Sequence, residues 1–196
     1  MTTVSPDPVR VESELAAGKL LCPSCGGQLA PWGWARPRPV GRGAARRRVC
    51  PRRSICRGCR ATHVLLPVSM LLRRGDWAVV LGRALELRAA GWGQRPIAAA
   101  VGVCRSTVRG WLSRFAVVAE AVRAHLTRWA LWLDDGLVRI EPSGSPLGDA
   151  VAAVVVAGGA AAAELGIGCR WQFASAVTGG RLLCNTRSPF LGRWRG

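Results

Sequence analysis

The spacing of apolar residues divides the chain into an irregular N-terminal part and a helical remainder. In residues 76–90, apolar side chains recur three and four positions apart, as on one face of a helix (Val80, Leu81, Ala84, Leu85, Leu87). We expect Asp76 to cap this helix and Gly91 to end it. Residues 18–67 show only short strand-like stretches among many Arg, Pro and Cys. The pattern predicts a mainly α protein with a small β module before the helices.

Residues 94–113 show the pattern of two helices joined by a tight turn. Gly102 stands where such a turn needs a left-handed backbone, which glycine adopts without strain. The second of these helices begins at Arg105 or Ser106. The two helices and their turn have apolar or small residues on the inner side (Ile97, Ala98, Val101, Val103, Val108, Trp111, Leu112). Together with the preceding helix, they predict a helix-turn-helix domain over residues 76–115.

A regular apolar stripe continues beyond this domain (Phe115, Val118, Ala119, Val122, Leu126, Trp129, Leu133). After the turn-rich residues 141–148 we expect a further helix over 149–165, with Asp149 as its N-cap and Gly166 just past its end. The stripe and this helix predict a small bundle or a dimer interface. Residues 116–165 are therefore interpreted as a helical self-association segment.

The ends of the chain carry weaker patterns. Residues 1–17 are polar and contain proline, and we expect a flexible leader there. Residues 18–67 form the predicted β module, and residues 166–196 are expected to be an irregular tail. The predicted order is thus an N-terminal β module, a central helix-turn-helix and a C-terminal helical segment.

The charge is strongly positive and unevenly placed. The chain has 28 Lys and Arg against 11 Asp and Glu, a net charge of +17, and all of the cations except Lys19 are arginines. Residues 1–115 hold 20 of the cations and only 5 of the anions. A surface of this kind favours a polyanionic partner, with nucleic acid as the first choice and an acidic membrane surface as the second.

The sequence gives no sign of export or of a membrane anchor. Residues 1–10 lack the apolar core of a secretory signal, and the apolar stretch over 151–163 is shorter than the roughly 20 residues of a membrane span. We therefore expect a cytoplasmic protein in a reducing environment. Its eight cysteines are then metal ligands or buried thiols rather than disulfides.

Four of the cysteines have the spacing of a metal site. They form two Cys-x-x-Cys pairs, separated by 30 residues (Cys22, Cys25, Cys56, Cys59). Each pair makes a turn that aims two thiolates at one point, and two such turns suit a tetrahedral zinc ion. The β module is therefore predicted to be a zinc ribbon. Cys50 and His63 are spare candidate ligands, unpaired thiols are the alternative, and Cys104, Cys169 and Cys184 are interpreted as buried or incidental.

A flexible basic loop is expected between the two cysteine pairs. Residues 36–53 contain eight Arg and three Pro. Residues 46–48 with 52–53 form either a strip that neutralises phosphates or a solvated charged loop. Trp32 and Trp34 offer faces for stacking on bases, but we favour the interpretation that at least one of them packs in the small core.

The solvent side of the second helix in the turn motif carries candidate DNA contacts. Arg109 and Ser106 are predicted at base edges, because arginine is the commonest reader of guanine in the major groove. Arg105 is predicted at a base or a phosphate, and Thr107 at a phosphate or as a cap. Two flanking arginines are predicted phosphate contacts (Arg95, Arg114). A helical hairpin with a basic face and no role in DNA binding is the alternative.

The turn motif resembles the helix-turn-helix of resolvases, invertases and transposases. The matching residues are Ile97-Ala98, Val101-Gly102-Val103, Thr107-Val108 and Trp111-Leu112. Gly110 departs from that pattern and costs about 1 kcal/mol of helix propensity relative to alanine.

A wider stretch looks like an uncharacterised family of zinc-ribbon/helix-turn-helix proteins of GC-rich bacteria, often described as transposase-like. The matching segments are residues 22–27, 32–36, 56–67, 91–115 and, in the tail, 171–180. The resemblance implies DNA binding linked to mobile elements.

No catalytic centre is predicted. A metal-dependent transposase needs three carboxylates around two metal ions, within a mixed sheet. The acids that follow the DNA-binding part lie in about 80 residues dominated by helix-forming Ala, Val and Leu, and no strand pattern surrounds them (Glu120, Asp134, Asp135, Glu141, Asp149, Glu164). We therefore expect a protein without enzymatic activity.

The sequence thus predicts a zinc protein that binds double-stranded DNA as a transposase-like recognition factor without its own catalytic core. A transcriptional regulator with the same surface is one alternative. The other is an adaptor whose zinc ribbon docks a transposase or another protein partner.

Overall fold

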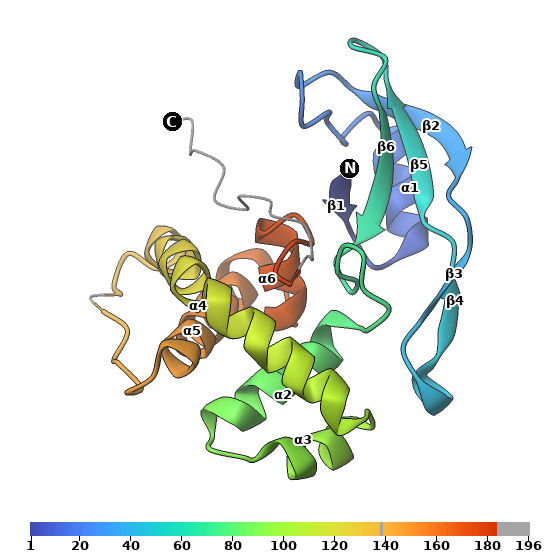
Figure 1. The fold of residues 1–196 in the computed structure, drawn as a ribbon. Coiled ribbons are helices and arrows are strands. Elements are labelled where there is room, and N and C mark those ends of the chain that lie inside the picture. The colour runs from blue at the N-terminus through green and yellow to red at the C-terminus, as the bar shows by residue number, and fades with distance from the viewer. Residues whose placement is uncertain (138, 184–196) are drawn as a thin grey trace.

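The computed structural model describes residues 1–137 and 139–183 and divides into two packed parts. We call residues 1–67 the ribbon and residues 77–183 the helical part. Figure 1 shows the strands of the ribbon, with one helix packed on them, on one side and the other helices gathered on the other. The described residues contain six α-helices, five of them in the helical part, so the predicted mainly α class holds in outline.

The ribbon is built on a four-stranded sheet with the order β1 (Thr2–Val4), β6 (Thr62–Pro67), β5 (Arg52–Cys56) and β2 (Leu29–Trp34). Strand β1 runs parallel to β6, and the other neighbours are antiparallel. Helix α1 (Pro8–Ala16) lies against this sheet, and two of its apolar side chains are buried in the small core of the ribbon (Val11, Leu15).

The expectation of a flexible leader over residues 1–17 is therefore wrong. Val4 is buried on β1, and Asp7 caps α1 by accepting a hydrogen bond from the backbone N–H of Val9 at 2.9 Å. Pro8 follows the cap, where its missing N–H costs nothing. The cap residue Asp7 and the following Pro8 are helix-start signals in the sequence, but the polar composition of residues 1–17 favoured the prediction of a flexible segment.

The basic loop over residues 36–53 is also more ordered than expected. It contains a two-stranded hairpin of β3 (Arg38–Val40) and β4 (Arg47–Val49), joined through a short 3-10 turn (Gly43–Ala45). Val40 is fully buried and packs with Leu66 and Met70. This apolar contact holds the base of the hairpin in place.

The helical part begins with the three helices of the predicted domain, α2 (Ala78–Ala89), α3 (Gln94–Val101) and α4 (Arg105–Leu133). Trp77, not Asp76, is the N-cap residue of α2. Gly91 and Gly102 have φ angles of +86° and +67°, so both glycines end their helices as predicted. Helix α4 runs for 29 residues without a break, so the helix with the predicted DNA contacts and the apolar stripe belong to one element.

Two further helices complete this part, α5 (Pro146–Leu165) and α6 (Arg170–Val177). Ser145 caps α5 by accepting from Gly148 N, whereas Asp149, the predicted cap, accepts from the backbone N–H and the hydroxyl of Ser143. Among the described residues, α5 is the one helix long and apolar enough to cross a membrane. Its apolar side packs on the stripe of α4, which is typical of a core helix in a bundle.

Helix α6 joins the helical part to the ribbon, so the prediction of an irregular tail from residue 166 is wrong at this point. The Ser175 hydroxyl donates to the Met70 carbonyl at 2.9 Å, and the Thr3 hydroxyl donates to the Ala176 carbonyl at 3.3 Å. Trp171 packs over Gly82 of α2, where any β-carbon would overlap its ring. Cys184 and the rest of the predicted tail, residues 184–196, lie outside the described residues.

Candidate nucleic-acid interface and metal centre

The four cysteines of the two Cys-x-x-Cys pairs come together at one end of the ribbon. The Sγ atoms of Cys22, Cys25, Cys56 and Cys59 all lie within 4.8 Å of one another. The Cys22–Cys59 and Cys25–Cys56 sulfurs are 3.7 Å and 3.4 Å apart. A tetrahedral zinc ion with bonds of about 2.3 Å places its sulfurs about 3.8 Å apart, so the donor set has a suitable size.

The backbone around these thiols favours thiolates. The N–H of Ser24 and that of Cys25 donate to Cys22 and, against the effect of burial, lower the pKa of that thiol to about 6. The N–H of Gly27 lowers the pKa of Cys25 in the same way. The N–H of Ala61 also lowers the pKa of Cys59, but the opposing effect of the neighbouring thiols is larger, and the pKa of Cys59 is raised to about 11. A cation among the four sulfurs would offset the repulsion between thiolates, so the cluster is compatible with a metal ion.

Gly27 makes room for this cluster. A β-carbon on Gly27 would lie 3.1 Å from the Cys56 sulfur and 3.4 Å from that of Cys25, whereas one on Gly58 would be in ordinary contact, 3.7 Å from the Cys25 sulfur. The two sulfurs can approach closely beside Gly27 because this position carries no side chain. The predicted ligand set is thus assembled in a form compatible with zinc.

The two spare candidates lie outside the cluster of four. His63 is buried beside it, with Nε2 3.3 Å from the Cys22 sulfur, and is therefore a neighbour of a ligand rather than a replacement for one. Cys50 is exposed and its thiol donates to the Ala35 carbonyl at 3.0 Å. The described histidines and cysteines thus leave the two Cys-x-x-Cys pairs as the donor set.

The turn between α3 and α4 has the geometry of a helix-turn-helix. Ile97 of α3 and Val108 of α4 are fully buried, with Trp111 and Leu112 on the same side of α4. The N–H of Val103 returns to the Ala98 carbonyl at 3.1 Å and closes the turn after Gly102. The buried side fixes the first turns of α4, which leaves its opposite side free for a partner.

The six predicted DNA contacts all have exposed or partly exposed side chains. Five are exposed (Arg95, Arg105, Ser106, Arg109, Arg114), and Thr107 is half-buried. Arg114 folds back and donates to the Gly110 carbonyl at 3.2 Å. A β-carbon on Gly110 would lie 3.0 Å from that guanidinium, so Gly110 leaves room for the folded conformation of Arg114. Contact of these residues with DNA stays a prediction.

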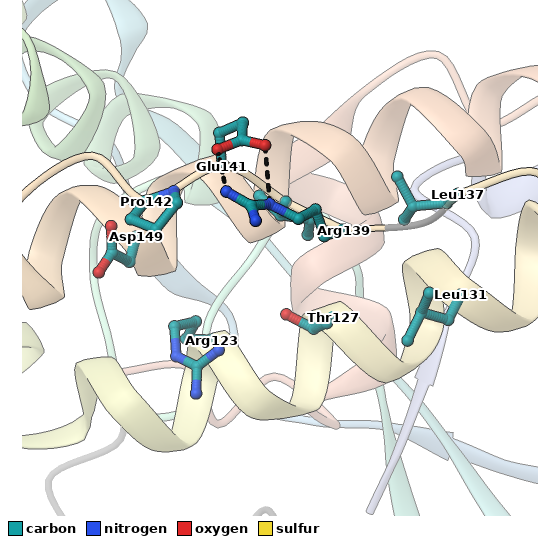
Figure 2. Close-up of a pocket in the computed structure, with 9 residues that line it drawn as sticks. Arg123, Thr127, Leu131, Leu137, Arg139, Glu141, Pro142 and Asp149 are labelled. Carbon is teal, nitrogen blue, oxygen red and sulfur yellow. Dashed lines mark hydrogen bonds and ion pairs between the residues drawn. The ribbon is translucent and has the colours of Figure 1, made fainter.

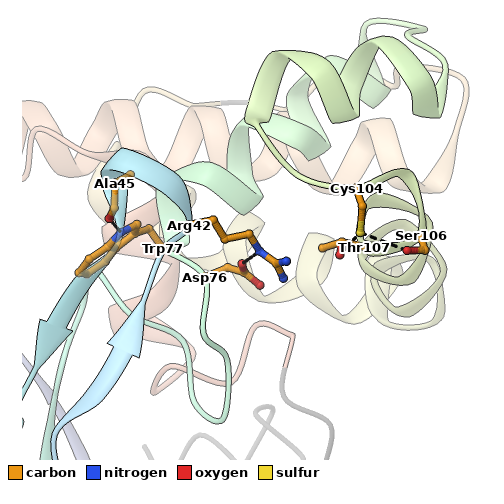
Figure 3. A network of polar contacts seen from close by, with 7 residues as sticks. All are labelled: Arg42, Ala45, Asp76, Trp77, Cys104, Ser106 and Thr107. Atoms are coloured by element: carbon orange, nitrogen blue, oxygen red, sulfur yellow. Dashed lines mark hydrogen bonds and ion pairs between the residues drawn. The ribbon is translucent and has the colours of Figure 1, made fainter.

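Cys104, interpreted from sequence as buried or incidental, is exposed at the N-cap of α4. Its sulfur lies 3.1 Å from the Ser106 hydroxyl and 3.0 Å from that of Thr107. Hydrogen bonds from these two residues lower the pKa of the thiol to about 7, and the charge of Arg42 adds to the effect. Figure 3 shows this cluster facing the guanidinium of Arg42. Its position directly before Arg105 was the signal that sequence reasoning overlooked.

The aromatic residues of the ribbon are more exposed than expected. Trp32 and Trp34 are 51% and 55% exposed, so the favoured interpretation that one of them packs in the core is wrong. The Arg52 guanidinium lies 4.7 Å from the ring centre of Trp34, pairs with Glu12 at 2.7 Å and donates to the Gly33 carbonyl at 2.6 Å. Arg52 is thus held by contacts within the ribbon. It does not extend the basic strip of residues 46–48, which is one of the two alternatives that the sequence left open.

A cavity of about 430 Å³ lies elsewhere, between α4 and the segment that leads to α5. Figure 2 shows Arg123 and Thr127 of α4 on one wall and Arg139 and Glu141 on the other. Arg139 and Glu141 form an ion pair at 2.6 Å, and Asp149 adds a second carboxylate. Because the charges of this lining balance, the cavity does not continue the basic surface.

Comparison with known proteins gives one match within the chain. The family model of the homeodomain-like domain matches residues 81–116, which covers most of α2, all of α3 and the start of α4. No curated protein and no solved structure matches this chain. Residues 81–116 are therefore similar to a homeodomain-like domain, and this similarity suggests a DNA partner.

Proposed function

We propose that this protein binds duplex DNA in a sequence-directed way, with the first turns of α4 in the major groove. One observation carries the proposal: α4 buries Val108 and Trp111 while the other side of the same turns exposes Arg105, Ser106 and Arg109. A helix fits the major groove, where arginine donates to guanine and serine reaches several base edges. The match to a homeodomain-like domain supports the same interpretation.

The ribbon carries a structural zinc ion in this proposal. Cys22, Cys25, Cys56 and Cys59 would hold it, and closure of their two turns would stabilise a module with little apolar core. The ion supplies folding free energy and takes no part in a reaction. We assign no catalytic step to the chain and place the protein in the cytoplasm, where thiols stay reduced.

Within DNA-binding functions, we favour a recognition protein of the transposase type that lacks a catalytic core. The support is the resemblance of the turn motif to resolvases, invertases and transposases. A transcriptional regulator would use the same surface, and the neighbouring genes distinguish the two roles. A homodimer bound to two half-sites would double the DNA contact.

The exposed Trp32 and Trp34 favour a second candidate, in which the ribbon also docks a protein partner. Exposed tryptophans are enriched in protein interfaces because they bury much area with little loss of conformational entropy. If docking were the main function, removal of both rings would abolish capture of the partner and leave DNA affinity unchanged.

The proposal is tested by selection from a random duplex library at about 150 mM salt, where screening limits non-specific attraction to a cationic protein. We expect a recovered motif, and an inverted repeat would indicate a dimer. Recovery of no motif would contradict sequence-directed binding.

Substitutions of Arg109 then test its role. Arg109→Ala should cost about 1–3 kcal/mol of binding free energy and relax the preference at one base position. Arg109→Lys keeps the charge but lacks the planar fork, so it should lose the same base preference. Equal losses on every sequence, with rescue by lysine, would instead make Arg109 a phosphate contact.

A further inference from the structure

The β3–β4 hairpin is the most basic element of the ribbon, and its charge is not balanced nearby in sequence. No Asp or Glu occurs between Glu14 and Asp76. Four arginines on or beside the turn of the hairpin are exposed (Arg42, Arg46, Arg47, Arg48). Residues 46–48 line a hollow of about 290 Å³ with Pro37 and Pro39. The hollow is cationic and fits an anion with several oxygen acceptors.

The hairpin is held against the helix-turn-helix by polar contacts as well as by the buried Val40. The N–H of Gly41 donates to the Gly75 carbonyl at 2.8 Å, and the indole N–H of Trp77 donates to the Ala45 carbonyl at 3.1 Å. Arg42 pairs with the buried Asp76 at 3.1 Å. Figure 3 shows the contacts of Trp77 with Ala45 and of Arg42 with Asp76.

Gly41 makes this attachment close. Its φ of +81° lies in the left-handed region, and a β-carbon there would overlap the Trp77 indole and crowd the Ala45 carbonyl. The turn of the hairpin therefore has a defined position beside α2 and does not extend freely into solvent.

The hairpin also lies beside the end of the molecule that presents the recognition helix. Residues 41–45 share a hollow with residues 101–103 of the turn before α4. Figure 3 shows the guanidinium of Arg42 directed toward Cys104 and Thr107 at the N-cap and first turn of α4. In Figure 1 the β5–β6 turn, with its cysteine pair, lies at the opposite end of the ribbon.

We propose that the β3–β4 hairpin is a second DNA-binding element, which contacts the phosphate backbone at the edge of the major groove occupied by α4. The proposal rests on the proposed function and adds a site to it. Arg46 and Arg48 contact phosphates, while Arg47 is held by its hydrogen bonds to the Ala44 and Arg46 carbonyls at 2.7 Å and 3.0 Å. Phosphate contacts of this kind set the register of the protein on the duplex without reading bases.

The test compares the double variant Arg46→Ala/Arg48→Ala with a matched control, Arg10→Ala/Arg57→Ala. Both variants remove two exposed arginines, but the control residues lie on α1 and in the cysteine turn. Binding of the full chain is measured over a range of salt, with a duplex recovered by selection and a shuffled duplex of the same composition. A plot of log affinity against log salt has a negative slope, and each lost phosphate contact reduces the magnitude of that slope by about 0.9.

We expect the hairpin variant to reduce the magnitude of the slope by about 2 on both duplexes, and the control to leave the slope unchanged. The affinity ratio of the selected to the shuffled duplex should stay the same. A hydroxyl-radical footprint should lose protection on one flank only. Equal slopes for the hairpin variant and the control would overturn the proposal, and loss of the affinity ratio would overturn its phosphate assignment.

Failure of the proposed function looks different. In that case the wild-type protein shows no preference for any duplex and Arg109→Ala changes nothing. The slope of the hairpin variant on the shuffled duplex still reports whether the hairpin contacts phosphates.

Discussion

The ribbon and the helical part are stabilised in different ways. The main core cluster of the ribbon has seven buried apolar residues, two of them from the cluster of four cysteines, and Val40 and Leu66 belong to a second small cluster. The core of the helical part contains 27 of its described residues together with Leu71, and Trp111, Phe115 and Phe173 are among them. Apolar burial contributes roughly 25 cal/mol per Å², so packing contributes much more to the helical part than to the ribbon, which the proposed zinc ion would stabilise further. The difference predicts that damage to one part leaves the other folded.

The largest effect is expected from Cys22→Ser. A structural zinc ion contributes on the order of 10 kcal/mol to the folding of small zinc modules, so loss of a ligand should unfold the ribbon. Metal content should fall below one ion per chain, and amide hydrogen exchange should lose protection in residues 1–67 while α4 stays protected. Cys50→Ser is the matched control, because Cys50 lies outside the cluster. A full complement of zinc in Cys22→Ser would refute the ligand set.

Phe115→Ala is the converse change. Phe115 is fully buried where the helix-turn-helix meets the α4–α5 bundle, so truncation should cost about 3–5 kcal/mol of unfolding free energy. Urea unfolding followed by circular dichroism measures the cost. The zinc content should not change. Val117→Ala, at a side chain that is 85% exposed, should shift stability by about 0.5 kcal/mol or less. Loss of zinc together with the helices would show that α6 couples the two parts into one unit.

A smaller effect is expected from His125→Gln. Burial lowers the pKa of His125 against the opposing effect of its hydrogen bond to the Val177 carbonyl, and the charge of Arg128 lowers it further. The unfolded chain then binds more protons than the folded one below a pH of about 6.5, so stability falls as the pH drops from 7 toward 5.

The glutamine amide can still donate to the Val177 carbonyl, so the stability at pH 7 should change by about 1 kcal/mol or less, and the unfolding free energy of the variant should fall less on acidification. Urea titrations at several pH values compare the two proteins, whose metal sites are identical. Parallel curves would show that His125 is not the group responsible.

The smallest change is chemical and leaves the fold intact. Cys104 is exposed with a pKa of about 7, so its reaction with iodoacetamide should reach half of its maximal rate near pH 7. Thiolates of the metal-bound ribbon should stay unreactive. Mass spectrometry of peptides locates the label, and duplex DNA should protect Cys104. Half-maximal reaction near pH 9 would show that Ser106 and Thr107 do not stabilise the thiolate.

Sequence reasoning succeeded where the signal is local. The left-handed glycine after α3 and the buried spacing of Val108, Trp111 and Leu112 lie within a few residues, so the helix-turn-helix was predicted in detail. The paired cysteines predicted the cluster of four thiols for the same reason, because each Cys-x-x-Cys turn is formed by its own residues.

It failed where a partner is distant. Asp76 has the residue type of a helix cap, but it instead pairs with Arg42, which lies 34 positions away. The leader and the tail carry weak periodicity, yet α1 and α6 are ordered because each covers an apolar surface formed by other segments.

The sequence by itself thus determined the two modules, the cluster of four thiols, the turn motif and the excess of positive charge in residues 1–115. Only the tertiary structure decided where that charge lies relative to α4. The contacts of Gly41, Arg42 and Ala45 with residues 75–77 bring the basic hairpin beside the start of α4. These contacts join residues 41–45 to residues 75–77, and no sequence pattern links these two segments. The contacts form only when the cores of the ribbon and of the helical part have both folded and packed against residues 68–76.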